Sequence, residues 1–204
     1  MDMPPEDRAR IAAAIAAAEA RTTGEIVCVL AERSSDTGAL PILLAALAAL
    51  ATPWLLVALT PLPVLTILAW QLVAFVALAV VLCLPPVRVA LIPRRARRAM
   101  AFRVATEQFF TRAVSRTRDR SGILIFVSLA EHYARIVADD GIAARVPQSH
   151  WQAAIEALVA HVRQDRIADG FVAAIGLCGA VLAEHFPRTD KADPNELPDR
   201  IYFI

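Results

Sequence analysis

The stretch that decides the fold is residues 37–87, which read TGALPILLAALAALATPWLLVALTPLPVLTILAWQLVAFVALAVVLCLPPV. This run of 51 residues holds no Asp, Glu, Lys or Arg, and Gln71 is its single amide side chain. A bilayer core about 30 Å thick is crossed by roughly 20 apolar residues in a helix. The run therefore predicts two transmembrane helices, at about 40–59 and 64–84, joined by the proline-containing turn at 60–63.

A helical hairpin buried inside a soluble protein is the alternative interpretation of this run. Such a hairpin needs apolar residues around it on all sides. The 204-residue chain has too little other apolar material to provide them. The transmembrane hairpin is therefore the favoured interpretation.

The charges beside the hairpin predict its orientation. Residues 88–120 carry ten Arg against two acidic side chains, whereas the segments before and after are both net acidic. Four of these arginines, Arg94, Arg95, Arg97 and Arg98, follow closely after the second helix. The positive-inside rule keeps such a flank in the cytoplasm. We therefore expect an integral protein of the bacterial inner membrane with both termini and the soluble part in the cytoplasm.

The same four arginines suit the anionic headgroups of the lipid bilayer, each basic side chain near the surface contributing about 1 kcal/mol. Nucleic acid is not expected as a partner, because the rest of the soluble part is acidic.

Outside the hairpin the pattern alternates between helices and strands. Helices are predicted at 5–21, 94–116, from Ser149 onward and at 167–185, and strands at 25–30, 123–127 and 133–138, with a turn at 139–141. The first helix and strand are too few to form a core alone, so strand 25–30 is expected to pair with strand 123–127. The fold class is therefore α/β, a single domain interrupted by a two-helix transmembrane hairpin. Its parts are residues 1–36, the hairpin at 37–93, residues 94–187 and an acidic, proline-containing tail at 188–204.

Several motifs in this order resemble the TPM-domain family, which includes thylakoid proteins of photosystem repair and many bacterial membrane proteins. They are residues 20–27 (ARTTGEIV), 116–128 (RTRDRSGILIFVS), 135–142 (RIVADDGI) and 193–199 (DPNELPD). The resemblance implies a compact α/β sandwich, often tied to a membrane. It also implies one of two activities, since some members are described as acid phosphatases that bind a divalent cation and others as non-enzymatic regulators of membrane complexes. In many members the span follows the domain, whereas here the spans interrupt it.

The best candidates for a metal site are Asp139 and Asp140, two adjacent carboxylates at the end of a predicted strand. Carboxylate oxygens are the ligands that Ca²⁺ and Mg²⁺ prefer, and Asp119 is a weaker catalytic candidate near the neighbouring strand. The alternative is that Asp-Asp-Gly is simply a good turn. A further acidic group in the tail, Asp190, Asp193, Asn195 and Glu196, is expected to be a solvated surface or a weaker cation site.

No complete catalytic motif accompanies these carboxylates: GxxxxGK[ST], GxGxxG, GxSxG and HExxH are all absent from the sequence. The first functional hypothesis is therefore a non-enzymatic, membrane-anchored module that binds or modulates another membrane protein or complex. The alternative is a divalent-metal-dependent phosphatase that uses Asp139, Asp140 and Asp119.

Overall fold

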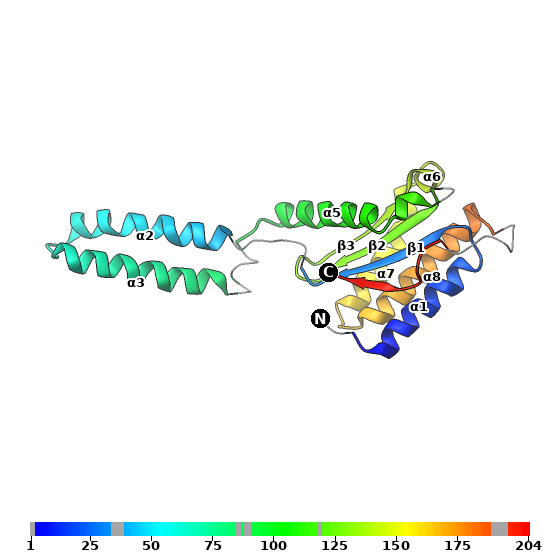
Figure 1. The fold of residues 1–204 in the computed structure, drawn as a ribbon, viewed down its shortest axis with the longest axis horizontal. Helices are drawn as coiled ribbons and strands as arrows, with labels where there is room; N and C mark the ends of the chain where they lie inside the picture. Colours follow the sequence, from blue (N-terminus) through cyan, green and yellow to red (C-terminus); the bar gives the residue numbers. More distant parts are fainter. Residues whose placement is uncertain (1–2, 34–38, 85–86, 88–90, 118–119, 189–195) are drawn as a thin grey trace. The chain divides into compact units, whose positions relative to one another are not determined.

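The computed structural model describes residues 3–33, 39–84, 87, 91–117, 120–188 and 196–204. It divides into two compact units, one made of Met1–Ser34 with Arg98–Ile204 and the other of Ser35–Arg97. The first unit is a mixed α/β domain, as expected, and the second is a helical hairpin (Figure 1).

A four-stranded sheet organises the first unit, with the strand order β3-β2-β1-β4. Strand β1 (Glu25–Ala31) runs parallel to β2 (Gly122–Ser128), with Glu25 opposite Gly122, although the whole hairpin lies between them in sequence. Strand β3 (Tyr133–Ala138) is antiparallel to β2, and β4 (Ile201–Phe203) is parallel to β1 on the other side. The predicted pairing of the two central strands is confirmed.

Helices cover both faces of this sheet, which explains why β1 and β2 are apolar at nearly every position. Figure 1 shows α1 (Pro5–Glu19), α7 (Gln152–Val162) and α8 (Ile167–His185) on one face and α5 (Arg94–Thr111) on the other. Alternate residues of β1 enter two cores, Ile26, Cys28 and Leu30 on the side of α1 and α8, and Val27, Val29 and Ala31 on the side of α5.

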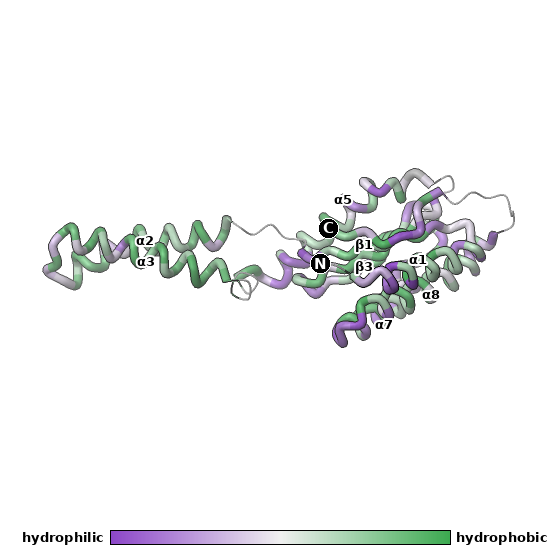
Figure 2. The backbone as a smooth tube through the Cα atoms, turned by 60° about the horizontal axis from the view of Figure 1, so that its bottom comes forward, coloured by the Kyte–Doolittle hydropathy of each residue, from purple (hydrophilic) through white to green (hydrophobic). Residues whose placement is uncertain are grey.

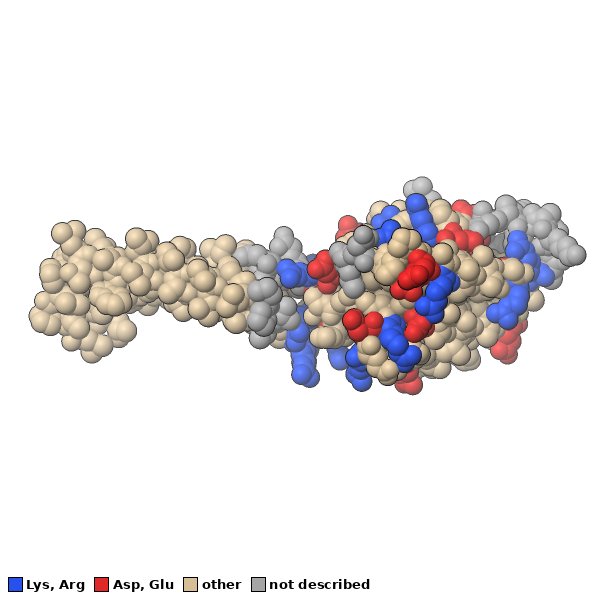
Figure 3. Space-filling model, turned by 90° about the horizontal axis from the view of Figure 1, so that it is seen from below, with Lys and Arg blue, Asp and Glu red and all other residues tan. Residues whose placement is uncertain are grey.

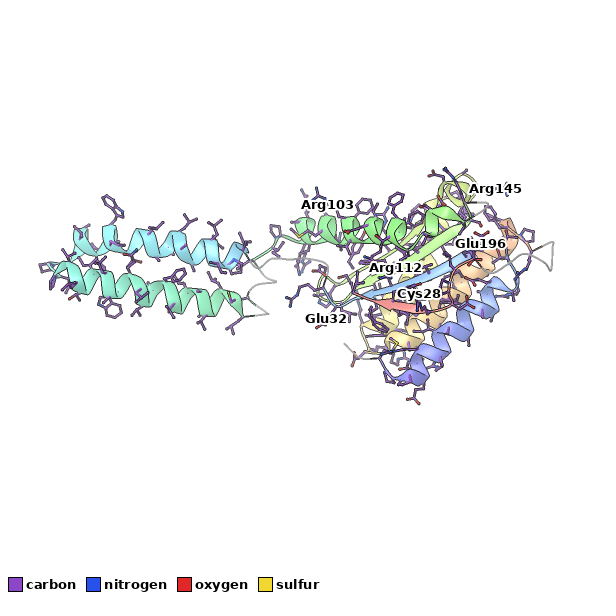
Figure 4. All side chains as sticks on the ribbon, viewed as in Figure 1. Cys28, Glu32, Arg103, Arg112, Arg145 and Glu196 are labelled. Atoms are coloured by element: carbon purple, nitrogen blue, oxygen red, sulfur yellow. The ribbon has the colours of Figure 1, made fainter. Side chains whose placement is uncertain are left out.

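The α5 face is stabilised by arginines stacked on aromatic rings. The guanidinium carbon of Arg112 lies 4.1 Å from the ring centre of Tyr202, and that of Arg135 lies 4.5 Å from the ring centre of Phe102. Both arginines therefore cover apolar surface with their guanidinium planes. Figure 4 shows Arg103 on the outer side of the same helix.

Three boundaries differ from the sequence-based expectation. The helix predicted to reach residue 116 ends at Thr111, where Ala113 takes a left-handed conformation (φ 59°) before a short 3-10 turn, Val114–Arg116. The next predicted helix does not begin at a Ser149 cap, because a 3-10 turn, Gln148–Trp151, begins there after Pro147. The end of the predicted tail is strand β4, whose apolar residues gain a partner in β1.

Ala101, Ala105 and Phe109 face the sheet, whereas Phe102 is 42% exposed. The first two are small, so their spacing is less visible in the sequence than that of the phenylalanines.

The second unit consists of α2 (Ala39–Leu59) and α3 (Val64–Cys83), joined by the turn that contains Pro61 and Pro63. Their most apolar windows have mean hydropathies of 2.4 and 2.5, and 11% and 6% of those windows is buried within the structure. Figure 2 draws both helices in the hydrophobic colour along most of their length, and Figure 3 shows no Lys, Arg, Asp or Glu on the visible face of the hairpin. Both helices are long and apolar enough to cross a membrane.

Among the described residues a third helix, α8, also meets this criterion of length and composition, with a mean hydropathy of 1.7. The sequence analysis predicted two such helices, so the count differs. Half of the apolar window of α8 is buried in the first unit, where Phe171, Ile175 and Leu182 form part of the core beneath the sheet. Its apolar character is thus explained by packing on the protein.

Candidate functional site

The predicted ligands Asp139 and Asp140 lie at the edge of the sheet where β2 begins. The backbone N–H of Asp139 donates to the carbonyl of Gly122, the first residue of β2, at 2.9 Å. Asp139 then caps the short helix α6 (Asp140–Ala143), because its Oδ1 accepts the backbone N–H of Asp140 at 2.7 Å. The predicted turn is therefore a capped helix start, a role that Asp fills well.

The two carboxylates have different surroundings. Asp139 is 5% exposed, and its second oxygen, Oδ2, is buried and has no hydrogen-bond partner among the residues that the structure describes. The side chain of Asp140 is 85% exposed, and its Oδ2 lies 3.2 Å from Nη1 of Arg120. Since a buried carboxylate oxygen is rarely left unsatisfied, Oδ2 of Asp139 is the atom of this pair best suited to a cation.

A complete ligand set is not present in the part of the chain that the structure describes. No group of three or more His, Cys, Asp or Glu side chains there could hold a metal ion. Asp119, the remaining predicted candidate, lies outside the described residues, as do Asp190, Asp193 and Asn195. Asp139 is the predicted ligand that offers a free buried oxygen.

A second acidic group at the same sheet edge was not predicted. Glu25 opens β1 opposite Gly122, and its carboxylate accepts the backbone N–H groups of Glu196 and Leu197 at 3.2 and 3.3 Å. It therefore holds the segment that leads into β4 against the sheet. Figure 4 shows Glu196 beside the beginning of β1.

Glu19, at the end of α1, is the other member of this group. It is 7% exposed, its Oε1 accepts the N–H of Ile26 at 2.7 Å, and its Oε2 is buried. Glu19 and Glu25 line a cavity of about 170 Å³ together with Ala16, Ala20, Thr22, Arg188 and Asp199. The buried carboxyl thus borders a small, polar space.

Burial governs the protonation of both glutamates. The pKa of Glu19 is raised to about 9, chiefly by desolvation and also by the charges of Glu25 and Asp199 and a hydrogen bond with the Asp199 side chain, while the hydrogen bond from Ile26 opposes the rise. Desolvation also raises the pKa of Glu25 above its ordinary value, while the bonds from Glu196 and Leu197 oppose it. At neutral pH Glu19 is therefore a neutral acid that can donate a hydrogen bond into the cavity.

A larger hollow, of about 400 Å³, opens at the other end of β2. It is lined by eleven residues, among them Ser128, His132, Tyr133, Arg163 and Asp165. Two of them, His132 and Asp165, have left-handed backbones, with φ of 48° and 59°. The side chains of His132 and Arg163 make no hydrogen bond or ion pair with any described residue, so this hollow presents donors to solvent.

The predicted membrane-facing arginines occupy the first turn of α5 and the beginning of the next. Arg94, Arg95 and Arg98 are exposed and Arg97 is half-buried, and no described carboxylate forms an ion pair with any of them. A helix N-terminus carries partial positive charge and favours anions. Four arginines at this end therefore need negative charge from elsewhere.

The sequence carried a signal for the missed glutamates. Glu19 and Glu25 stand within or beside apolar segments, where a charged residue is seldom buried unless it is paired or neutral. Glu19 and Glu25 come close together because α1 and β1 fold back along each other. The pattern of residues along the sequence does not show this packing.

Comparison with known proteins supports one family. The model of the TPM domain family matches residues 85–181. Among solved structures, the NMR structure of BA42 protein from the psychrophilic bacterium Bizionia argentinensis has a TM-score of 0.63 at 21% sequence identity, covering 100% of this chain and 97% of that one. This likeness concerns the fold alone. A search of curated proteins found no match.

Proposed function

Because the TPM domain model matches residues 85–181 of this chain, we propose that it is a membrane-anchored TPM-domain protein whose soluble domain binds or modulates another membrane protein without catalysing a reaction. The hairpin α2–α3 is its anchor in the bacterial inner membrane, and the domain works on the cytoplasmic side.

The exposed apolar surface of α2 and α3 is the observation that carries this proposal. Trp54 is 82% exposed, Leu65 81% and Leu59 71%. Burying one large apolar side chain contributes about 1.5–3 kcal/mol, so a hairpin bearing many of them is strongly favoured in lipid. The helices have 21 and 20 residues, long enough to span the hydrocarbon core.

The arginines at the beginning of α5 support the orientation. Arg94, Arg95 and Arg98 are exposed and have no described carboxylate partner, at a helix end that repels them. Lipid phosphates on the cytoplasmic face would supply the missing negative charge, at about 1 kcal/mol for each arginine.

The contacts that Asp139 and Asp140 make within the protein support a binding role. One oxygen of Asp139 caps α6 and one oxygen of Asp140 pairs with Arg120. The hollow at the other end of β2 instead offers two donors without a described partner, His132 and Arg163, beside apolar walls. Such a surface suits a peptide segment of a partner that carries an acidic side chain.

Topology in intact cells tests the anchor. The parent chain has Cys83→Ala, while Cys28 and Cys178 stay because they are buried in the core. Single cysteines are added at Leu62, in the turn of the hairpin, and at the exposed Glu184. We expect an impermeant thiol reagent to label the Leu62→Cys protein alone, and alkaline carbonate to leave the chain in the membrane fraction. Labelling of Glu184→Cys instead would reverse the orientation, and release by carbonate would overturn the anchor.

A divalent-metal-dependent phosphatase is the second candidate, favoured by the unpaired, buried Oδ2 of Asp139. Asp139→Asn separates this role from capping, since Asn is also a good N-cap residue. If Asp139 binds Ca²⁺ or Mg²⁺, excess cation raises the melting temperature of the wild-type protein, and Asp139→Asn abolishes both this rise and any hydrolysis of p-nitrophenyl phosphate. If the cation changes neither quantity in the wild type, the phosphatase is excluded.

A further inference from the structure

Gln71 is the amide side chain in the charge-free run of residues 37–87, and it lies within α3, eight residues into a helix of twenty. It makes no hydrogen bond with any residue that the structure describes. A primary amide offers two donors and an acceptor. If α3 crosses a bilayer, no water is available there to satisfy them.

Thr52 in α2 and Thr60 directly after it show how other polar groups in the hairpin are satisfied. The hydroxyl of Thr52 donates to the carbonyl of Ala48 at 3.0 Å, and that of Thr60 donates to the carbonyl of Leu56 at 2.7 Å. Each bond stays within one helix, four residues back. The longer amide of Gln71 has no such local bond and must be satisfied from outside its own helix.

Gln71 also lines a shallow groove between the two helices. The groove has a volume of about 370 Å³, and its other walls include Ala46 and Ala49 from α2 and Leu68 and Phe75 from α3. The alanines bring the groove floor close to the backbone of α2, which is how transmembrane helices admit a neighbour at short distance. The amide therefore lies where another helix can pack.

We propose that this groove is the contact surface of a homodimer in the bilayer, in which Gln71 pairs with the partner's Gln71. The inference rests on the proposed membrane anchor. A second copy is the occupant because a two-fold axis places the partner's amide at the same depth, where each amide can donate to the other and accept from it. A different membrane helix would need its own polar group at that depth.

Self-association of the full chain in liposomes tests the proposal. One batch of the Cys83→Ala parent carries a donor dye at Glu184→Cys, and a second batch carries an acceptor dye at the same position. The two batches are mixed, and energy transfer between them is measured while the lipid-to-protein ratio increases. We expect Gln71→Leu to raise the dissociation constant about tenfold, in keeping with one interhelical amide contact in a membrane. Gln71→Asn, which keeps the amide, should retain most of the association, and Thr52→Val, which removes a satisfied hydroxyl, should leave it unchanged.

Disulfide formation locates the contact surface. In the same parent without dyes, Leu68→Cys lies on the groove beside Gln71. Val73→Cys is two residues after Gln71 and therefore about 200° around the helix from it. Leu68 and Val73 are both about half-exposed. Oxidation in membranes should cross-link two copies through position 68 and not through position 73.

Three results overturn the homodimer. The first is that energy transfer in the wild-type chain does not exceed the level of random mixing. The second is that Gln71→Leu associates as strongly as the wild type. The third is that position 68 cross-links to a different protein. Carbonate extraction distinguishes the two failures: a chain that stays in the membrane but is monomeric refutes this inference and leaves the anchor intact, whereas a chain that is extracted refutes both.

Discussion

Replacing Glu19 with Gln should make the stability of the soluble domain much less dependent on pH. In the folded protein the pKa of Glu19 is raised from its ordinary 4.5 to about 9 by burial. Below pH 4.5 the carboxyl is protonated in both the folded and the unfolded chain, so it favours neither. Between pH 4.5 and 9 the unfolded chain ionises while the folded chain keeps its proton.

The unfolded state is therefore favoured progressively as the pH rises through this window. The free energy of unfolding falls by about 1.4 kcal/mol per pH unit for one such group. Between pH 5 and pH 8 the loss from Glu19 amounts to about 4 kcal/mol. Gln has the same shape as the protonated acid and cannot ionise, so Glu19→Gln should match the wild type at pH 5 and be more stable by about that amount at pH 8.

The assay follows the fluorescence of Trp151, which is 1% exposed in the core. Trp54 and Trp70 of the hairpin are replaced by Phe, so that urea unfolding of the full chain in detergent micelles reports on the soluble domain. Free energies of unfolding are compared at pH 5, 6, 7 and 8. Glu184→Gln, at an exposed position of α8, is the matched control and should keep the wild-type slope.

A shallow slope should remain in Glu19→Gln, because burial also raises the pKa of Glu25. The reasoning is refuted if wild type and Glu19→Gln show parallel pH profiles. It is also refuted if the variant is the less stable protein at pH 8, since that would mean that Glu19 is ionised in the folded state.

Three further predictions concern single positions in the same domain. A Cβ at Gly122 would lie 2.5 Å from Cγ1 and 2.6 Å from the carbonyl oxygen of Val114, so Gly122→Ala should destabilise the domain by about 2–3 kcal/mol in urea unfolding, and wild-type stability would contradict this packing. Gly176 has no atom within 4 Å of its Cβ position, and Gly176→Ala should raise stability by about 0.5–1 kcal/mol through helix propensity; a loss would show a hidden contact. Asp139→Ala should lower the free energy of unfolding by about 1 kcal/mol, because it removes the cap of α6, while Asp139→Asn should lower it by less. Equal losses in the two variants would mean that the cap contributes little.

The sequence alone determined the elements that depend on local apolar pattern. The charge-free run of residues 37–87 predicted two long apolar helices, found at Ala39–Leu59 and Val64–Cys83, and the continuous apolar runs predicted β1 and β2 as strands covered on both faces. These features can be predicted locally, because the length of an apolar segment and the spacing of its apolar residues indicate whether lipid or protein covers it, and on how many faces. Short motifs also resembled the TPM family, and the TPM domain model matches residues 85–181.

Tertiary structure alone decided which distant residues meet. The last strand, Ile201–Phe203, is three residues long and has no pattern of its own until β1 offers hydrogen-bond partners. Asp139 and Asp140, adjacent in sequence, separate into a buried cap and an exposed ion pair because a helix begins between them. Glu19 becomes a neutral acid because α1 returns along β1 and removes its carboxyl from water. Burial of a charge depends on neighbours that are far away along the chain, and this is why the linear pattern could not predict it.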